Sequence, residues 1–163
     1  MWRILENKRG LSLIELVVTM VILTVLGSLI LPSARTMSKR TKEIELKRNL
    51  REIRTALDDY KKNYDKALSD QKTQQVVNKS GYPATLQLLV DGDDLGGLVK
   101  EKKKFLRRIP TDPFHKAEGE ETPWGLRSYA DAPDSTTWGG EDVFDVYSQS
   151  EETAIDGTKY KDW

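Results

Sequence analysis

The chain of 163 residues contains no cysteine and a single histidine, and these absences remove whole classes of function. Without cysteine it can form neither a disulfide nor a thiolate metal site, and one histidine cannot build a multi-histidine metal centre. No glycine-rich phosphate loop occurs either, so we expect no bound nucleotide. These absences argue against an enzyme and favour a structural role.

The charges are balanced in number but unevenly placed, with 26 basic and 26 acidic residues. The first ten residues carry Arg3, Lys8 and Arg9 against Glu6, a bias that predicts a cytoplasmic amino end beside a membrane. From residue 110 onward acidic residues predominate, and we interpret them as the solvated surface of an exported domain. The basic run at 100–108 is interpreted as a solvated face or a subunit contact, because such a run is a weak indication of nucleic-acid binding.

Residues 16–34 contain no charged side chain and nearly reach the roughly 20 apolar residues that a membrane-spanning helix needs. A secretory signal peptide would have a shorter apolar stretch with a cleavage site after it, whereas here Gly10 precedes the stretch. Gly27 and Pro32 interrupt the helix. Because proline removes an amide donor and clashes with the carbonyl four residues before it, we expect a kink or local melting between them.

Beyond residue 34 the pattern becomes that of a charged amphipathic helix. Its apolar stripe, with alternating spacings of four and three, consists of Leu46, Leu50, Ile53, Leu57, Tyr60 and Tyr64. We expect the stripe to pack on a sheet formed later in the chain, with the basic side chains, Arg54 among them, left outside. A helix from Leu11 to about Tyr64 would be on the order of 80 Å long, so its first half needs a membrane or a bundle of identical helices around it.

The remainder is predicted to form a small α+β head. Residues 84–90 favour a short helix and 91–97 a turn, while 126–130 and 143–148 have the composition of strands in an antiparallel sheet. The predicted organisation is a cleaved leader at 1–10, a hydrophobic helix at 11–34, an amphipathic helix at 35–66 and the head at 67–163.

Residues 9–16, RGLSLIEL, resemble the processing motif of type IV pilin-like proteins, and the chain looks closest to the major pseudopilin of type II secretion systems. The resemblance implies that a prepilin peptidase cuts between Gly10 and Leu11, that Leu11 is then N-methylated, and that Glu15 becomes the fifth mature residue. The family usually has Phe where this chain has Leu11. A carboxylate near a membrane centre costs about 2.5–3.5 kcal/mol, so we expect Glu15 to pair with the Leu11 amino terminus of a neighbouring subunit.

Shorter similarities favour a secretion pseudopilin over an adhesive pilus subunit. They lie at 81–83, 110–114 and 144–148, and the chain also lacks the C-terminal cysteine pair of many pilus subunits. The resemblance implies a homo-oligomeric helical filament that drives export across the outer membrane, built from a single-pass inner-membrane protein with a periplasmic head. Its implied partners are the prepilin peptidase, an inner-membrane assembly platform and minor pseudopilins. A type IV pilus subunit for adhesion, motility or DNA uptake is the alternative, and a plain membrane-anchored periplasmic domain is another.

The resemblance also implies a calcium site after the second strand. Major pseudopilins often bind calcium there through carboxylates and carbonyls, and the oxygen ligands that this loop offers are Ser148, Ser150, Glu151, Glu152 and Asp156. The alternative is a loop held by the packing of Tyr160 and Trp163. We expect no other cofactor.

Overall fold

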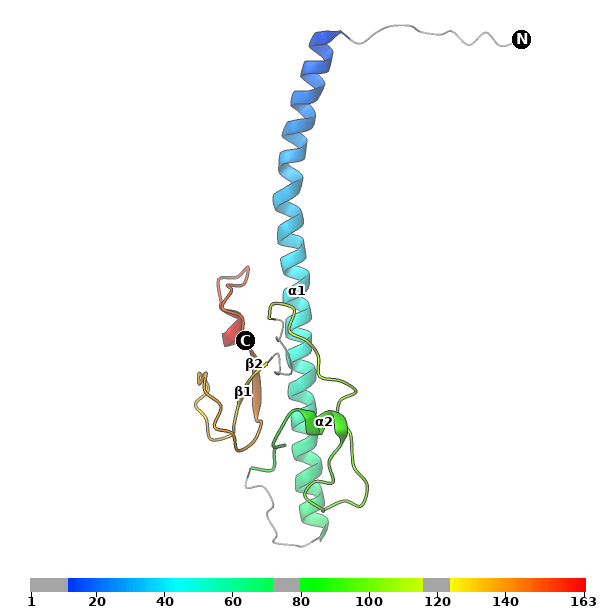
Figure 1. Ribbon diagram of the computed structural model, residues 1–163, viewed down its shortest axis with the longest axis vertical. Coiled ribbons are helices and arrows are strands. Elements are labelled where there is room, and N and C mark those ends of the chain that lie inside the picture. Colours follow the sequence, from blue (N-terminus) through cyan, green and yellow to red (C-terminus); the bar gives the residue numbers. More distant parts are fainter. Residues whose placement is uncertain (1–11, 72–79, 116–123) are drawn as a thin grey trace, which may run out of the picture. The chain divides into compact units, whose positions relative to one another are not determined.

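The computed structural model describes residues 12–71, 80–115 and 124–163, without the side chains of residues 29–35 and 71. The chain divides into two units, Met1–Lys39 and Arg40–Trp163, and the second is called the head unit below. The elements follow the order α1 (Leu13–Gln71), α2 (Gln87–Asp91), β1 (Trp124–Arg127), β2 (Asp145–Ser148) and a short 3₁₀ helix, η1 (Tyr160–Asp162) (Figure 1). A long N-terminal helix followed by a small antiparallel sheet confirms the predicted α+β architecture.

Helix α1 continues to Gln71, beyond the predicted end at residue 66. Its last turns are stabilised by an i,i+4 ion pair between Lys61 Nζ and Asp65 Oδ1 at 2.6 Å and by the burial of Ala67. Apolar contact at Ala67 therefore accompanies the extension of the helix past residue 66.

The predicted apolar stripe is confirmed, because all six of its side chains are at most 4% exposed. The stripe forms one side of a core that also contains Leu89 of α2, Trp124 of β1, Val146 of β2 and Tyr160 of η1. Residues of every element of the head thus meet on one face of α1. At about 25 cal/mol per Å² of apolar surface removed from water, this burial is the main source of the head's stability.

Helix α2 and the segment after it cover a second part of the core. Leu89 is fully buried, and its carbonyl accepts the amides of Phe105 and Leu106, each at 2.9 Å. The intervening chain reverses at Gly92, whose φ of +88° is in the region that favours glycine, and Asp93 then pairs with Lys103 in an isolated bridge. The turn predicted at 91–97 is present.

Strands β1 and β2 pair antiparallel, with Trp124 opposite Ser148 and Arg127 opposite Asp145. The first strand was predicted at 126–130, but it ends at Arg127 because carboxylates take over the next backbone amides. Ser128 N donates to Asp131 Oδ2 at 2.7 Å, and the following amide, of residue 129, donates to the Asp142 carboxylate at 2.8 Å. In the view of Figure 1 the two strands lie beside α1, and α2 is drawn across it.

Candidate functional site

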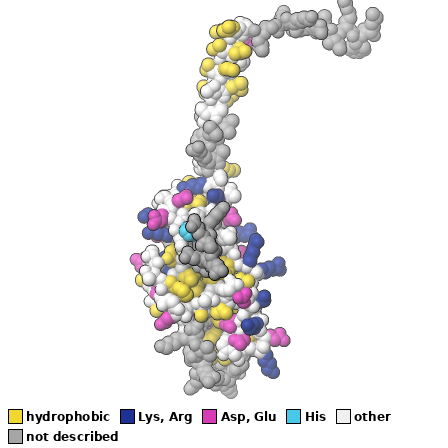
Figure 2. Space-filling view, viewed as in Figure 1, with side chains coloured by type: hydrophobic (Ala, Val, Ile, Leu, Met, Phe, Trp, Pro, Cys, Tyr) yellow, Lys and Arg dark blue, Asp and Glu magenta, His cyan; other side chains and the backbone are white. Residues whose placement is uncertain are grey.

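The first turns of α1 expose nearly every apolar side chain that they carry. Leu13 is 81% exposed, and the others reported as exposed large hydrophobics in this stretch are Ile14, Leu16, Val17, Val18, Met20, Val21, Ile22, Leu23, Val25 and Leu26. Figure 2 shows them as hydrophobic side chains along the described beginning of the helix. Because consecutive positions cover the whole circumference of a helix, no side of this stretch is buried within the chain. Such a surface requires an apolar environment.

Three of the four polar side chains at residues 13–28 satisfy their hydroxyl groups within the helix itself. Thr19 donates to the carbonyl of Leu16 at 2.9 Å, Thr24 to that of Met20 at 2.7 Å, and Ser28 to that of Val25 at 2.7 Å. This back-bonding is a common arrangement where water is scarce. These three residues are therefore compatible with an apolar environment.

Glu15 carries the fourth polar side chain of residues 13–28, and this side chain is not satisfied within the helix. It lies in the first turn of α1, where the helix dipole favours a carboxylate, and it is exposed. Its carboxylate forms no hydrogen bond or ion pair with any other residue that the structure describes. In an apolar environment this carboxylate would need a partner from outside the described chain. Gly10 and Leu11, the predicted cleavage and methylation residues, lie outside the described residues.

The predicted break at Gly27 and Pro32 is absent from this structure, in which α1 passes through both residues as one helix. A proline within a helix removes a single donor, here the one facing the Ser28 carbonyl, while the hydrogen bonds on either side can persist. A Cβ on Gly27 would meet no atom within 4 Å, so no packing within the chain requires glycine there. Melting in an assembled filament stays a prediction.

The candidate calcium ligands are engaged in separate hydrogen bonds. Ser148 Oγ donates to the buried Asp112 Oδ2 at 2.5 Å and accepts the amide of Ser150 at 3.2 Å. The Asp156 carboxylate accepts the amide and the hydroxyl of Thr158 at 2.9 and 2.6 Å, and these bonds lower its pKa. Glu151 is exposed.

These bonds leave few oxygens of this loop available to an ion. Across the described part of the chain, no group of three or more carboxylates, histidines or cysteines is arranged to hold a metal ion. The alternative, a packed loop, is supported by the ring of Tyr160, which lies 4.1 Å from that of Phe114 and 5.1 Å from that of Trp163. The calcium site therefore stays a prediction.

Sequence analysis missed two polar residues that tie α1 to the end of the chain. Arg54, expected to lie outside, donates to Asp145 Oδ1 at 2.7 Å and to the carbonyls of Val146 and Trp163 at 3.0 and 2.7 Å. Glu43 Oε1 accepts the Tyr160 hydroxyl at 2.9 Å, and this bond adds to the burial that raises the pKa of Tyr160. Their positions in the sequence could have indicated this role, because both residues flank the apolar stripe and therefore lie near the edge of the core.

Residues 6–31 match the family model of the prokaryotic N-terminal methylation motif. The motif indicates a type IV pilin-like precursor. It includes Gly10, Leu11, Glu15 and Gly27, so the unpartnered carboxylate and the exposed apolar turns belong to the matched segment. In type IV pilin-like proteins this segment is processed by a prepilin peptidase and enters a filament. No curated protein and no solved structure matches the chain.

The membrane-spanning helix was predicted at 11–34, and residue 11 and the side chains of 29–34 lie outside what the structure describes. Within the part that is described, no helical stretch is both long enough and apolar enough to cross a membrane.

Proposed function

We propose that this chain is a structural subunit of a type II secretion pseudopilus. Residues 11–34 would store it in the bacterial inner membrane with its head in the periplasm, and it would assemble into a helical filament that drives protein export across the outer membrane. One observation carries the proposal. The segment that matches the methylation motif contains the exposed apolar turns, and among the polar side chains of residues 13–28 Glu15 alone lacks a partner within the described residues.

In this proposal Glu15 sets the axial register of the filament. After cleavage at Gly10, the amino group of Leu11 in one subunit would meet the Glu15 carboxylate of the next, and the pair would remove two charges from an apolar environment. Removing one partner of such a pair typically costs about 3–5 kcal/mol, because the other charge is left without compensation. The pair thus favours one register over all others.

The partners and the energy source of the filament are inferred from the resemblance to the pseudopilins of type II secretion systems. A prepilin peptidase, an inner-membrane assembly platform and minor pseudopilins would be its partners, and a cytoplasmic ATPase would supply the energy, since no nucleotide-binding motif occurs in the sequence. The role is structural rather than catalytic.

The absence of cysteine supports a pseudopilus over a surface pilus, because many pilus subunits close their C-terminal region with a disulfide. A pseudopilus and a surface pilus are expected to give different observations. Long extracellular fibres with a retraction ATPase would assign the chain to a type IV pilus, whereas loss of exoprotein secretion on deletion would assign it to a secretion system.

The first test is the intact mass of the membrane-extracted protein from cells with and without the prepilin peptidase. We expect peptidase-dependent loss of residues 1–10 and one added methyl group at Leu11. An uncleaved chain in both strains would indicate a plain membrane anchor, and the assembly role of Glu15 would be withdrawn.

The second test is Glu15→Ala, with Asp70→Ala as the control because Asp70 is an exposed carboxylate at the other end of the same helix. We expect Glu15→Ala to abolish filaments in sheared-cell and membrane fractions while far-ultraviolet circular dichroism shows a folded head, and Asp70→Ala to assemble normally. Normal filaments from Glu15→Ala would refute the pairing.

A further inference from the structure

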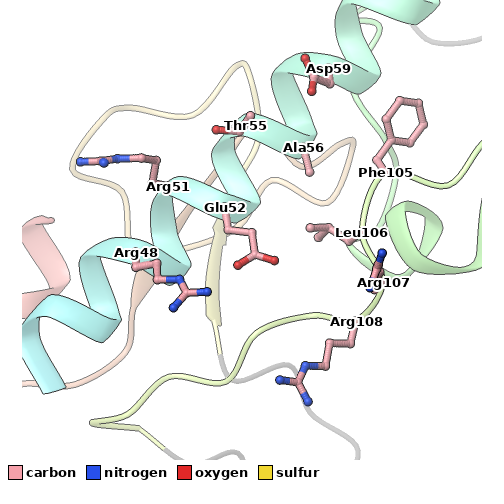
Figure 3. Close-up of a pocket in the computed structure, with 10 residues that line it drawn as sticks. All are labelled: Arg48, Arg51, Glu52, Thr55, Ala56, Asp59, Phe105, Leu106, Arg107 and Arg108. Carbon is pink, nitrogen blue, oxygen red and sulfur yellow. The ribbon is translucent and has the colours of Figure 1, made fainter. Parts of the chain in front are cut away.

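A groove runs along α1 in the head unit, between the helix and residues 105–111. It consists of a hollow of about 600 Å³ that continues into a second of about 570 Å³. Arg48 and Glu52 of α1 lie on one side of the first hollow, and Arg107 and Arg108 lie on the other, as Figure 3 shows. Arg51 also lines this hollow, but its side chain points away from Arg107 and Arg108. The half-buried ring of Phe105 also lines the groove.

The four arginines are exposed, and none forms a hydrogen bond or ion pair between its side chain and another described residue. Three acids also line the groove: Asp59 is paired with Lys62 at 3.3 Å, and Glu45 and Glu52 are exposed. The arginines therefore outnumber the acids, and the groove carries a net positive charge. A planar guanidinium group pairs well with carboxylates and also stacks on aromatic rings, so the matching surface would be acidic and aromatic.

The head has an acidic and aromatic surface of this kind on the loop at residues 128–142 and on residues 143–144, which follow it. Tyr129 is 63% exposed, Phe144 41% and Trp138 38%, and the first two rings meet edge to face at 5.3 Å. Asp134 and Glu141 are exposed on the same loop and pair with no other residue in the described ranges. Aromatic and acidic groups are thus presented together.

This loop is held in shape by its own hydrogen bonds. The Asp131 carboxylate accepts the amides of Ser128 and Gly139 at 2.7 and 3.0 Å, and the indole of Trp138 donates to the Asp142 carbonyl at 2.7 Å. A surface that is already ordered loses little conformational entropy when a partner binds it. The loop is therefore suited to be recognised as a unit.

The loop leads into β2, which is bound by Arg54 of α1. Residues 105–108 instead lie along Glu52 and Ala56, which are each two positions from Arg54 and therefore on a different side of the helix. The two surfaces therefore flank different sides of α1 and are separate surfaces of one head. Two different, complementary surfaces on one protein make a head-to-tail contact, and such a contact repeats without closing unless the rotation forms a ring. This is the geometry that a filament requires.

We propose that the arginine groove of one copy receives the 128–142 loop of the next copy, with Arg107 and Arg108 facing Asp134 and Glu141. The proposal rests on the proposed filament function and assigns the contact between heads. Electrostatic complementarity of this kind fixes register and orientation, and it weakens as salt concentration rises.

The natural absence of cysteine makes a direct test possible in the full-length chain. Thr111 and Thr136 are exposed, lie beside the groove and within the loop respectively, and carry no charge. The reporter variant Thr111→Cys/Thr136→Cys should form a ladder of disulfide-linked oligomers when membranes are oxidised. The matched control is Thr111→Cys/Gln149→Cys, whose second cysteine is exposed but outside the loop. We expect it to form dimers at most.

Charge reversal then tests the chemistry on the reporter variant. Reversing the groove with Arg107→Glu/Arg108→Glu, or the loop with Asp134→Arg/Glu141→Arg, should each reduce the ladder about tenfold or more. Combining all four changes should restore it, because the two surfaces are complementary again. Recovery also shows that the reversed chains fold.

The outcomes separate this contact from the filament role. Filaments without a ladder above the control would overturn the contact and leave the proposed function standing. A ladder without filaments would support the contact and overturn the proposed function. A ladder that ignores both reversals would also overturn the contact. Retention of a short DNA duplex by the groove, lost on groove reversal and with no ladder, would overturn it in favour of a phosphate-bearing partner.

Discussion

Replacing Arg54 by alanine should destabilise the head more than replacing any neighbouring arginine of α1. The guanidinium joins three segments, because it bonds Asp145 and the Val146 carbonyl of β2 and the carbonyl of Trp163 at the end of the chain. Its side chain is 38% exposed and that of Asp145 is 24% exposed. It is thus a partly solvated clamp that holds the strand and the C-terminal segment against the helix.

The magnitude follows from what is lost and what remains. Hydrogen bonds from a charged group contribute about 1.5–3 kcal/mol each when buried, but solvent screening reduces an exposed pair to about 0.2–1 kcal/mol. Asp145 would keep Arg127, whose Nη1 lies 3.4 Å from Oδ2, so no carboxylate is left isolated. We therefore expect a loss of about 2 kcal/mol for Arg54→Ala, below the cost of breaking a buried pair.

Lysine at this position should recover only part of the loss, because an ammonium is a point charge that cannot reach all three acceptors in one plane. The assay is urea unfolding of the full-length protein in detergent, followed by the fluorescence of the buried Trp124. Arg51→Ala is the matched control, since Arg51 is exposed on the same helix and has no partner among the described residues. Equal midpoints for the alanine variants of Arg54 and Arg51 would refute the clamp.

Three further predictions concern single contacts. Tyr60→Phe removes the hydroxyl that donates to Asp93, a bond that together with burial raises the pKa of Tyr60. The substitution should lower the free energy of unfolding by about 1–2 kcal/mol in the same urea assay. An unchanged free energy of unfolding would mean that the hydroxyl bonds water equally well. Gly125→Ala should cost about 1–3 kcal/mol, because its Cβ would lie 2.2 Å from the Tyr147 ring, and an unshifted melting temperature would show that the ring moves freely. Backbone bonds lower the pKa of Asp131, so its contribution is full above the ordinary value of 3.8 and is lost as pH falls through the lower folded value. Asp131→Asn should flatten the pH dependence of stability below about pH 4, and an unchanged acid transition would exclude this carboxylate as a source.

The helical periodicity was enough to predict the core face of α1. All six stripe residues are buried, because an apolar spacing of four and three places side chains on one face whatever covers it. The ends of elements were predicted less well. Strand β1 ends before residue 128 because the carboxylates of Asp131 and Asp142 compete for backbone amides, and no local pattern specifies that competition.

Residue order alone accounts for the processing motif, the exposed apolar turns and the place of Glu15, because each depends on neighbours within one helix or one short run. The clamp of Arg54, the shape of the 128–142 loop and the arginine groove depend on residues far apart in the chain. Arg54 and Trp163 are separated by 109 positions, and Arg48 and Arg108 meet at one groove only after α2 has turned the chain back along α1. Local periodicity specifies which face of a helix is apolar, whereas packing of the whole head specifies which distant charges share a surface.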